Sequence, residues 1–154
     1  MTPMNAWLSN INFKRAAYFS ASLGYLYVAF LCLVPGDYRA HTISLPINTQ
    51  TYLFLDKIEH AFAYALLGAL TIIAVRHKFE FNRVLIAIVA IVAFAGTLEL
   101  SQLFIPGRDC HIDDFVASTS GAVLGASMTY LLLRYLAGKL SLNIFPAFAS
   151  RRLS

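Results

Sequence analysis

The stretch that decides the fold is Gly96–Gly125, GTLELSQLFIPGRDCHIDDFVASTSGAVLG. It begins in one apolar segment, crosses a short polar loop and ends in a second apolar segment. Charged and amide side chains gather around the loop, although only 13% of the chain is charged. Ionisable groups at the ends of membrane segments are costly, and they indicate a functional site by default. The stretch therefore predicts two membrane helices that meet at a polar site.

The whole composition supports a membrane protein. Hydrophobic residues make up 58% of the 154 residues, whereas soluble domains average about 45–50%. Lipid must therefore be the solvent for most of the surface, and the length fits a single domain over residues 1–154. Cys32 and Cys110 are too few for a disulfide framework and have no metal-ligand spacing. A bridge between them is conceivable, since both are predicted on the outer side, but two thiols are expected because a disulfide needs a narrow Cα separation.

Four apolar runs are long enough to span a bilayer, which requires about 20 helical residues. Lys14 and Arg15 precede the first run as in a signal peptide, but no small-residue cleavage site follows, so we expect an uncleaved helix. The tail from Ala137 to Ser154 is interpreted as a membrane-surface segment. The predicted fold is an all-α polytopic bundle of four transmembrane helices, at about residues 16–34, 52–75, 84–105 and 114–136.

The basic residues predict the orientation. Nine of the twelve lysines and arginines lie near the termini or in the turn at 76–83, on one side of the membrane. By the positive-inside rule, both termini are then cytoplasmic and the polar loop is extracytoplasmic. The net charge of +4 is therefore a topology signal, and no nucleic-acid partner is expected. The basic residues counted are Lys14, Arg15, Arg76, Lys78, Arg83, Arg134, Lys139, Arg151 and Arg152; the other three are Arg39, Lys57 and Arg108.

The second apolar run opens with the charged cluster DKIEH, Asp56–His60. Asp56, His60 and Tyr64 are spaced i, i+4, i+8 and share one helical face. Two alternatives are a capping box that pairs Asp56 with Glu59 at a helix start and an interfacial role for His60.

The third run contains Glu99 and Gln102, which are three residues apart and face the same way. Pro106 and Gly107 end this helix, which places Glu99 roughly 9 to 10 Å below its terminus. An isolated carboxylate at that depth is strongly disfavoured. A polar partner or a wet cavity is therefore expected beside it.

The fourth run places Asp114, Ser118, Gly121 and Gly125 on one face. Gly121 and Gly125 form a G-x-x-x-G pair that lets another helix approach closely, so Asp114 should point into the bundle. An N-cap role for Asp113 or Asp114 is the alternative. If the last three helices are neighbours, their polar groups converge on one extracytoplasmic pocket. The N-termini of the second and fourth helices would favour an anion there.

An ordered set of motifs resembles the VanZ-like family of small membrane proteins. The set is Asp56-Lys57-x-x-His60, Glu99-x-x-Gln102, Pro106-x-Arg108, and Asp114 followed by Gly121 and Gly125, over about residues 56–133. The resemblance implies a bacterial cytoplasmic membrane and an outward-facing polar site. The founding member is associated with teicoplanin resistance. Ser118 stands where relatives usually carry Asn, and His111 where many carry an acid.

The leading functional prediction is that this site binds or modifies an anionic cell-envelope component. The class includes lipid-linked precursors, phospholipids and peptidoglycan-related molecules, with glycopeptide resistance or envelope homeostasis as the process. Arg108 is predicted to clamp a phosphate or carboxylate, helped by Lys57. The catalytic candidates are Glu99, His60 and Asp114; the ligand-binding candidates are Asp56, Lys57, Gln102, Arg108, Asp113 and Ser118.

Three other functions compete with this one. A membrane hydrolase or transferase would use a carboxylate/His pair or a metal. A small transporter would use Glu99, and a purely structural protein would use the polar network to hold its helices together. No cofactor is predicted and no metal ligand is assigned, although the excess of outer acids is compatible with a divalent cation. The expected partners are membrane lipids and the anionic ligand, and the oligomeric state stays open.

Overall fold

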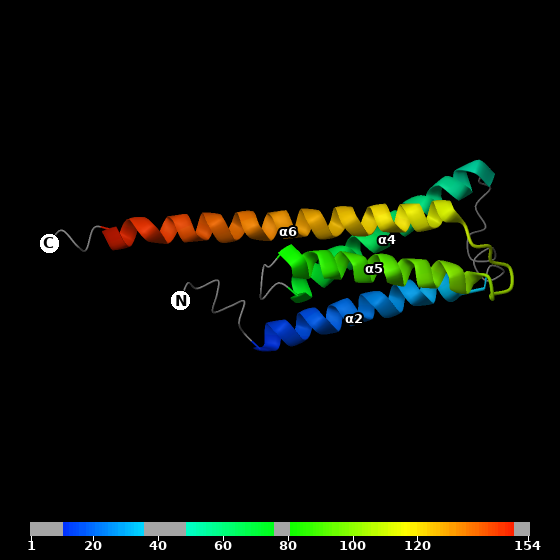
Figure 1. Ribbon diagram of the computed structural model, residues 1–154, viewed down its shortest axis with the longest axis horizontal. Helices are drawn as coiled ribbons and strands as arrows, with labels where there is room; N and C mark the ends of the chain where they lie inside the picture. Colours follow the sequence, from blue (N-terminus) through cyan, green and yellow to red (C-terminus); the bar gives the residue numbers. More distant parts are fainter. Residues whose placement is uncertain (1–10, 36–48, 76–80, 150–154) are drawn as a thin grey trace.

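The computed structural model describes residues 11–35, 49–75 and 81–149, and within these ranges it contains helices and no strand. The helices are α2 (Ile11–Leu33), α4 (Thr49–Val75), α5 (Phe81–Gln102) and α6 (Ile112–Ala149). Each is long and apolar enough to cross a membrane. They run alternately up and down, so the beginning of α2 and the end of α6 lie toward the same end (Figure 1). The predicted all-α membrane bundle is confirmed, and the chain is a multi-pass membrane protein.

The outward faces of the bundle are apolar. Large side chains such as Phe19, Phe30, Phe62 and Met128 are more than half exposed. A soluble protein rarely exposes so much contiguous apolar surface, whereas lipid solvates it well. The buried residues of the interior include small ones, such as Ala122 and Ala126, and large ones, such as Tyr64, Leu67 and Ile91.

The most extensive contact between helices is that of α4 with α6. A Cβ atom at Gly121 would overlap the carbonyl oxygen of Ala61, and one at Gly125 would overlap that of Ala65. From the other side, a Cβ at Gly68 would lie 2.6 Å from the carbonyl oxygen of Ala122. Association in lipid depends on such close packing of small residues, because apolar burial gives no net gain there. The backbones of α4 and α6 therefore touch along the face that bears the polar site.

Helix α5 ends at Gln102, three residues before the predicted limit. The chain then tightens, since the Leu103, Phe104 and Ile105 amides each donate to a carbonyl three residues back, at 3.3, 3.1 and 3.0 Å. Pro106 disfavours helical dihedrals at Ile105 and has no N–H to donate, so the helix cannot continue through this turn. Gly107 follows with φ of 72°, a left-handed conformation that suits glycine. Glu99 consequently lies in the last turn of α5, about 4–5 Å from its end and not 9 to 10 Å.

Helix α4 begins at Thr49, earlier than predicted, and is continuous through the charged cluster. The alternative of a capping box between Asp56 and Glu59 is therefore wrong, because both residues lie well inside the helix. The N-terminus of α4 also lies about 10 Å along the axis from Asp56. The expectation that it would act directly on a ligand at the site is wrong for the same reason.

Helices α2 and α6 also exceed their predicted limits. Helix α2 begins at Ile11, and α6 continues to Ala149, so the segment from 137 to 149 is helical. At 1.5 Å per residue, α6 is about 57 Å long and exceeds the roughly 30 Å of hydrocarbon. Figure 1 shows it projecting beyond the other helices. The predictions made for Arg39, Arg76, Lys78, Arg151 and Arg152 lie outside the described residues.

Candidate functional site

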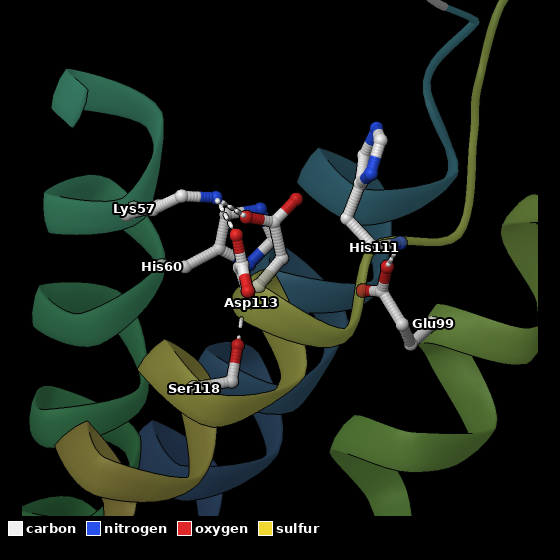
Figure 2. Close-up of polar contacts among 7 residues, drawn as sticks. Lys57, His60, Glu99, His111, Asp113 and Ser118 are labelled. Atoms are coloured by element: carbon white, nitrogen blue, oxygen red, sulfur yellow. Dashed lines mark hydrogen bonds and ion pairs between the residues drawn. The ribbon is translucent and has the colours of Figure 1, made fainter. Parts of the chain in front are cut away.

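Lys57 joins α4 to the first turn of α6. Its Nζ donates to Asp114 Oδ1 at 3.1 Å and lies 3.5 Å from Asp113 Oδ2 (Figure 2). Asp114 is only 6% exposed, whereas the Asp113 side chain is 70% exposed. Both acids follow the start of α6, where the helix dipole favours negative charge. The amides of Asp114 and Phe115 donate to the His111 carbonyl, so neither acid is the N-cap.

His60 lies one turn further along α4, opposite α6. Its Nδ1 lies 3.2 Å from Ser118 Oγ, and both residues are buried. Asp56 precedes His60 by one turn on the same face. Asp56, His60 and Asp114 can each offer a ligand atom within 4.8 Å of the other two. The α4–α6 cluster, as we define it, comprises Asp56, Lys57, His60, Asp113, Asp114 and Ser118.

Glu99 occupies a neighbouring position on α5. It is 6% exposed, and its Oε1 accepts a 2.6 Å hydrogen bond from the backbone amide of His111. Figure 2 shows it directed at the chain that leads into α6, apart from Lys57 and Ser118. It interacts electrostatically with Asp114 and His60. The polar partner expected for Glu99 is thus, in this structure, a backbone amide of the loop.

Gln102 closes α5 and is 2% exposed. Its Nε2 has no hydrogen-bond partner in the described part of the chain. A buried donor without a partner costs about 1–3 kcal/mol. Gln102 therefore has a spare donor one helical turn from Glu99.

Arg108 contacts α2, which the sequence did not predict. Its Nε donates to the Val34 carbonyl at 3.1 Å and its Nη2 to the Leu31 carbonyl at 2.8 Å. Leu31 lies in the last turn of α2 and Val34 directly follows the helix, where carbonyl groups lack intrahelical partners. A guanidinium has five N–H donors, so three remain after these two bonds. Every residue has a backbone carbonyl, so no sequence pattern distinguishes the two that accept hydrogen bonds from Arg108.

Cys32 and Cys110 form no disulfide with each other, as expected. Cys110 lies in the loop before α6 and is partly exposed. Burial, followed by the negative charges of Glu99 and Asp114, raises the pKa of its thiol. Cys32 is buried in α2 and lines a small cavity of about 10 Å³ with His60 and Tyr64. That volume is close to the minimum that holds one water molecule.

Comparison with known proteins identifies the family. The model of the VanZ/LLP1 family matches residues 5–134, which extends the resemblance carried by the motifs almost to the N-terminus. No curated protein and no solved structure matches the chain. The matched range includes α2, α4 and α5, α6 as far as residue 134, and every residue of the α4–α6 cluster. The chain belongs to the VanZ/LLP1 family.

Proposed function

We propose that this protein binds the anionic headgroup of a cell-envelope component at the α4–α6 cluster. One observation supports the proposal above all. Lys57 and His60 of α4 directly contact Asp114 and Ser118 of α6 in a bundle whose buried residues are mostly apolar. Polar and ionisable groups within membrane helices are costly to bury and generally mark a ligand or ion pathway.

Lys57 would recognise the anion. Its side chain is 35% exposed, so the ammonium group can be reached from the membrane surface. An ammonium has three donors, of which its contacts with Asp113 and Asp114 occupy two. The start of α6 adds the partial positive charge of a helix N-terminus. Phosphate and carboxylate headgroups are the anions that these groups suit.

The location of the site is part of the proposal. The asymmetry of basic residues supports cytoplasmic termini, and hence an α4–α6 cluster on the extracytoplasmic side. The family supports a bacterial cytoplasmic membrane, with a lipid-linked precursor, phospholipid or peptidoglycan-related molecule as the ligand class. Glycopeptide resistance or envelope homeostasis would be the process served.

Modification of the bound component is a second candidate function. It is favoured by the contact between His60 Nδ1 and Ser118 Oγ, which places a proton-transfer group beside a hydroxyl in a buried site. Histidine changes charge between pH 5 and 8, and positioned side chains of this kind contribute about 10²–10⁴-fold to reaction rates. Asp114 and Glu99 would assist by holding or moving protons.

The test of the binding function compares Lys57 of α4 with Lys139 of α6, a lysine outside the α4–α6 cluster. Native mass spectrometry of the purified protein would measure bound phosphatidylglycerol against phosphatidylcholine. Lys57→Gln should weaken phosphatidylglycerol binding about tenfold, because a hydrogen bond to a charged group contributes about 1.5–3 kcal/mol. Lys139→Gln is the matched control, since Lys139 is exposed near the other end of the membrane span. Equal binding by both variants, or no preference for the anionic lipid, would contradict the proposal.

A further inference from the structure

We propose that Asp56, His60 and Asp114 bind a divalent first-row cation such as Zn²⁺ or Mn²⁺. The inference goes beyond the proposed function, because it concerns a cation and needs no envelope ligand. The three ligand atoms lie within 4.8 Å of one another. In a tetrahedral site with bonds of about 2.0–2.2 Å, the ligand atoms lie about 3.3–3.6 Å from one another. Closing the site therefore requires side-chain movements of about 1 Å, which rotations of the aspartate and histidine side chains can supply.

The backbone around the three residues is rigid. Asp56 and His60 are four residues apart on α4 and face the same side. Asp114 comes from α6, and the spacing of the two helices is fixed where Gly121 meets the carbonyl of Ala61, the residue after His60. A site built on two helices in backbone contact is held more precisely than a site on loops.

Ser118 orients the histidine as a metal site requires. A metal-binding imidazole usually donates its second ring N–H to a neighbouring acceptor, which fixes the tautomer. His60 Nδ1 lies 3.2 Å from Ser118 Oγ. In the tautomer that donates from Nδ1 to this oxygen, the lone pair of Nε2 is left for the cation. Three protein ligands would leave open positions for water or for a phosphate oxygen.

The charge of the cluster also favours a cation. By formal charge, the three carboxylates of Asp56, Asp113 and Asp114 outnumber the single ammonium of Lys57 by two. A divalent ion would cancel this excess.

The ligand set indicates the kind of metal. Imidazole suits Zn²⁺ and other first-row ions, and carboxylates suit Mn²⁺ as well as Mg²⁺ and Ca²⁺. The mixed set of one imidazole and two carboxylates therefore favours Zn²⁺ or Mn²⁺. The competing explanation is that Lys57 alone neutralises Asp114 and no ion binds. The two explanations make opposite predictions for a variant that lacks this lysine.

The test uses full-length protein, purified in detergent and stripped with a chelator. Titration with Zn²⁺ or Mn²⁺, followed by calorimetry and elemental analysis, should show about one ion per chain and a raised melting temperature. Asp56→Asn and Asp114→Asn should each weaken binding at least tenfold. Ser118→Ala should weaken it about tenfold through the orientation of His60. Lys57→Gln should tighten binding, because it removes the ammonium that competes for Asp114 Oδ1.

Glu59→Gln is the control, since Glu59 lies on α4 between the ligands, is exposed and carries the same charge. It should leave metal affinity within about twofold of wild type. An equal loss of affinity in Glu59→Gln and Asp56→Asn would overturn the proposal, as would a folded wild-type protein that binds no ion. Weaker binding by Lys57→Gln would also overturn it. Anionic-lipid binding is measured separately, so failure of the cation site and failure of the proposed function are distinguishable.

Discussion

At the scale of single residues, Cys110 reports on the electrostatics of the site. Burial and the charges of Glu99 and Asp114 raise the pKa of its thiol, so the reactive thiolate forms at higher pH than in an ordinary cysteine. The rate of alkylation by a membrane-impermeant maleimide should rise with pH through a correspondingly high midpoint. Glu99→Gln removes one negative charge and should move that midpoint to lower pH.

The measurement is best made in a Cys32→Ala background, so that Cys110 is the only thiol. An unchanged pH profile in the Glu99→Gln variant would show that Glu99 does not act on the loop. Applied to intact cells, the same reagent also tests the proposed orientation. Labelling of Cys110 from outside is expected, and protection from the reagent would place the site on the other side.

The kinds of residue at the site were predictable from the sequence, but their partners were not. Lys57 and Asp114 stand out as charges in apolar runs, yet their pairing spans 57 residues and depends on how two helices pack. Arg108 was predicted to clamp an anion, and the structure shows two of its donors on the carbonyls of Leu31 and Val34. Charge and position can be read along a chain, whereas a contact with a distant backbone depends on tertiary structure.

At the scale of the helices, the contact of α4 with α6 determines whether the α4–α6 cluster assembles. Gly125→Ala should destabilise the protein by about 1–3 kcal/mol or more, because the new Cβ would overlap the carbonyl of Ala65. Gly138→Ala on the same helix meets no atom within 4 Å, and it should stabilise by about 0.5–1 kcal/mol through helix propensity. Thermal unfolding in detergent measures both. Equal shifts in melting temperature would mean that the helices do not touch at Gly125.

The apolar runs predict the number of membrane helices correctly, but they predict the residues at which the helices begin and end less accurately. The four spans were predicted because lipid imposes a minimum apolar length. The early end of α5 arises from local tightening before Pro106, and the extension of α6 to Ala149 occurs where hydropathy no longer marks a span. A hydropathy pattern identifies the segments that lie in lipid. It does not identify the part of a helix that extends beyond the membrane.

At the scale of the whole molecule, the polar groups gather at one end of the bundle, and they form two neighbouring arrangements. The sequence predicted convergence of the last three helices on one pocket. In the structure, α4 and α6 form the α4–α6 cluster, while Glu99 of α5 binds the loop backbone beside it. Gly121 and Gly125 indicate that another helix packs closely against α6. The residues of α4 that they contact, Ala61 and Ala65, could not be identified from the sequence, because alanine is frequent throughout the chain.

The central claim is that the α4–α6 cluster serves to bind a ligand and does not stabilise the fold. The most direct test is the melting temperature, in lipid nanodiscs, of a variant with apolar replacements: Lys57→Met, His60→Leu, Asp114→Leu and Ser118→Ala together. Replacing a whole buried ion pair by apolar residues is often neutral or stabilising by about 1–4 kcal/mol, whereas removing one partner costs about 3–5 kcal/mol. We predict a melting temperature equal to or above that of wild type. A melting temperature several degrees lower would show that the cluster holds the helices together, and it would contradict this account.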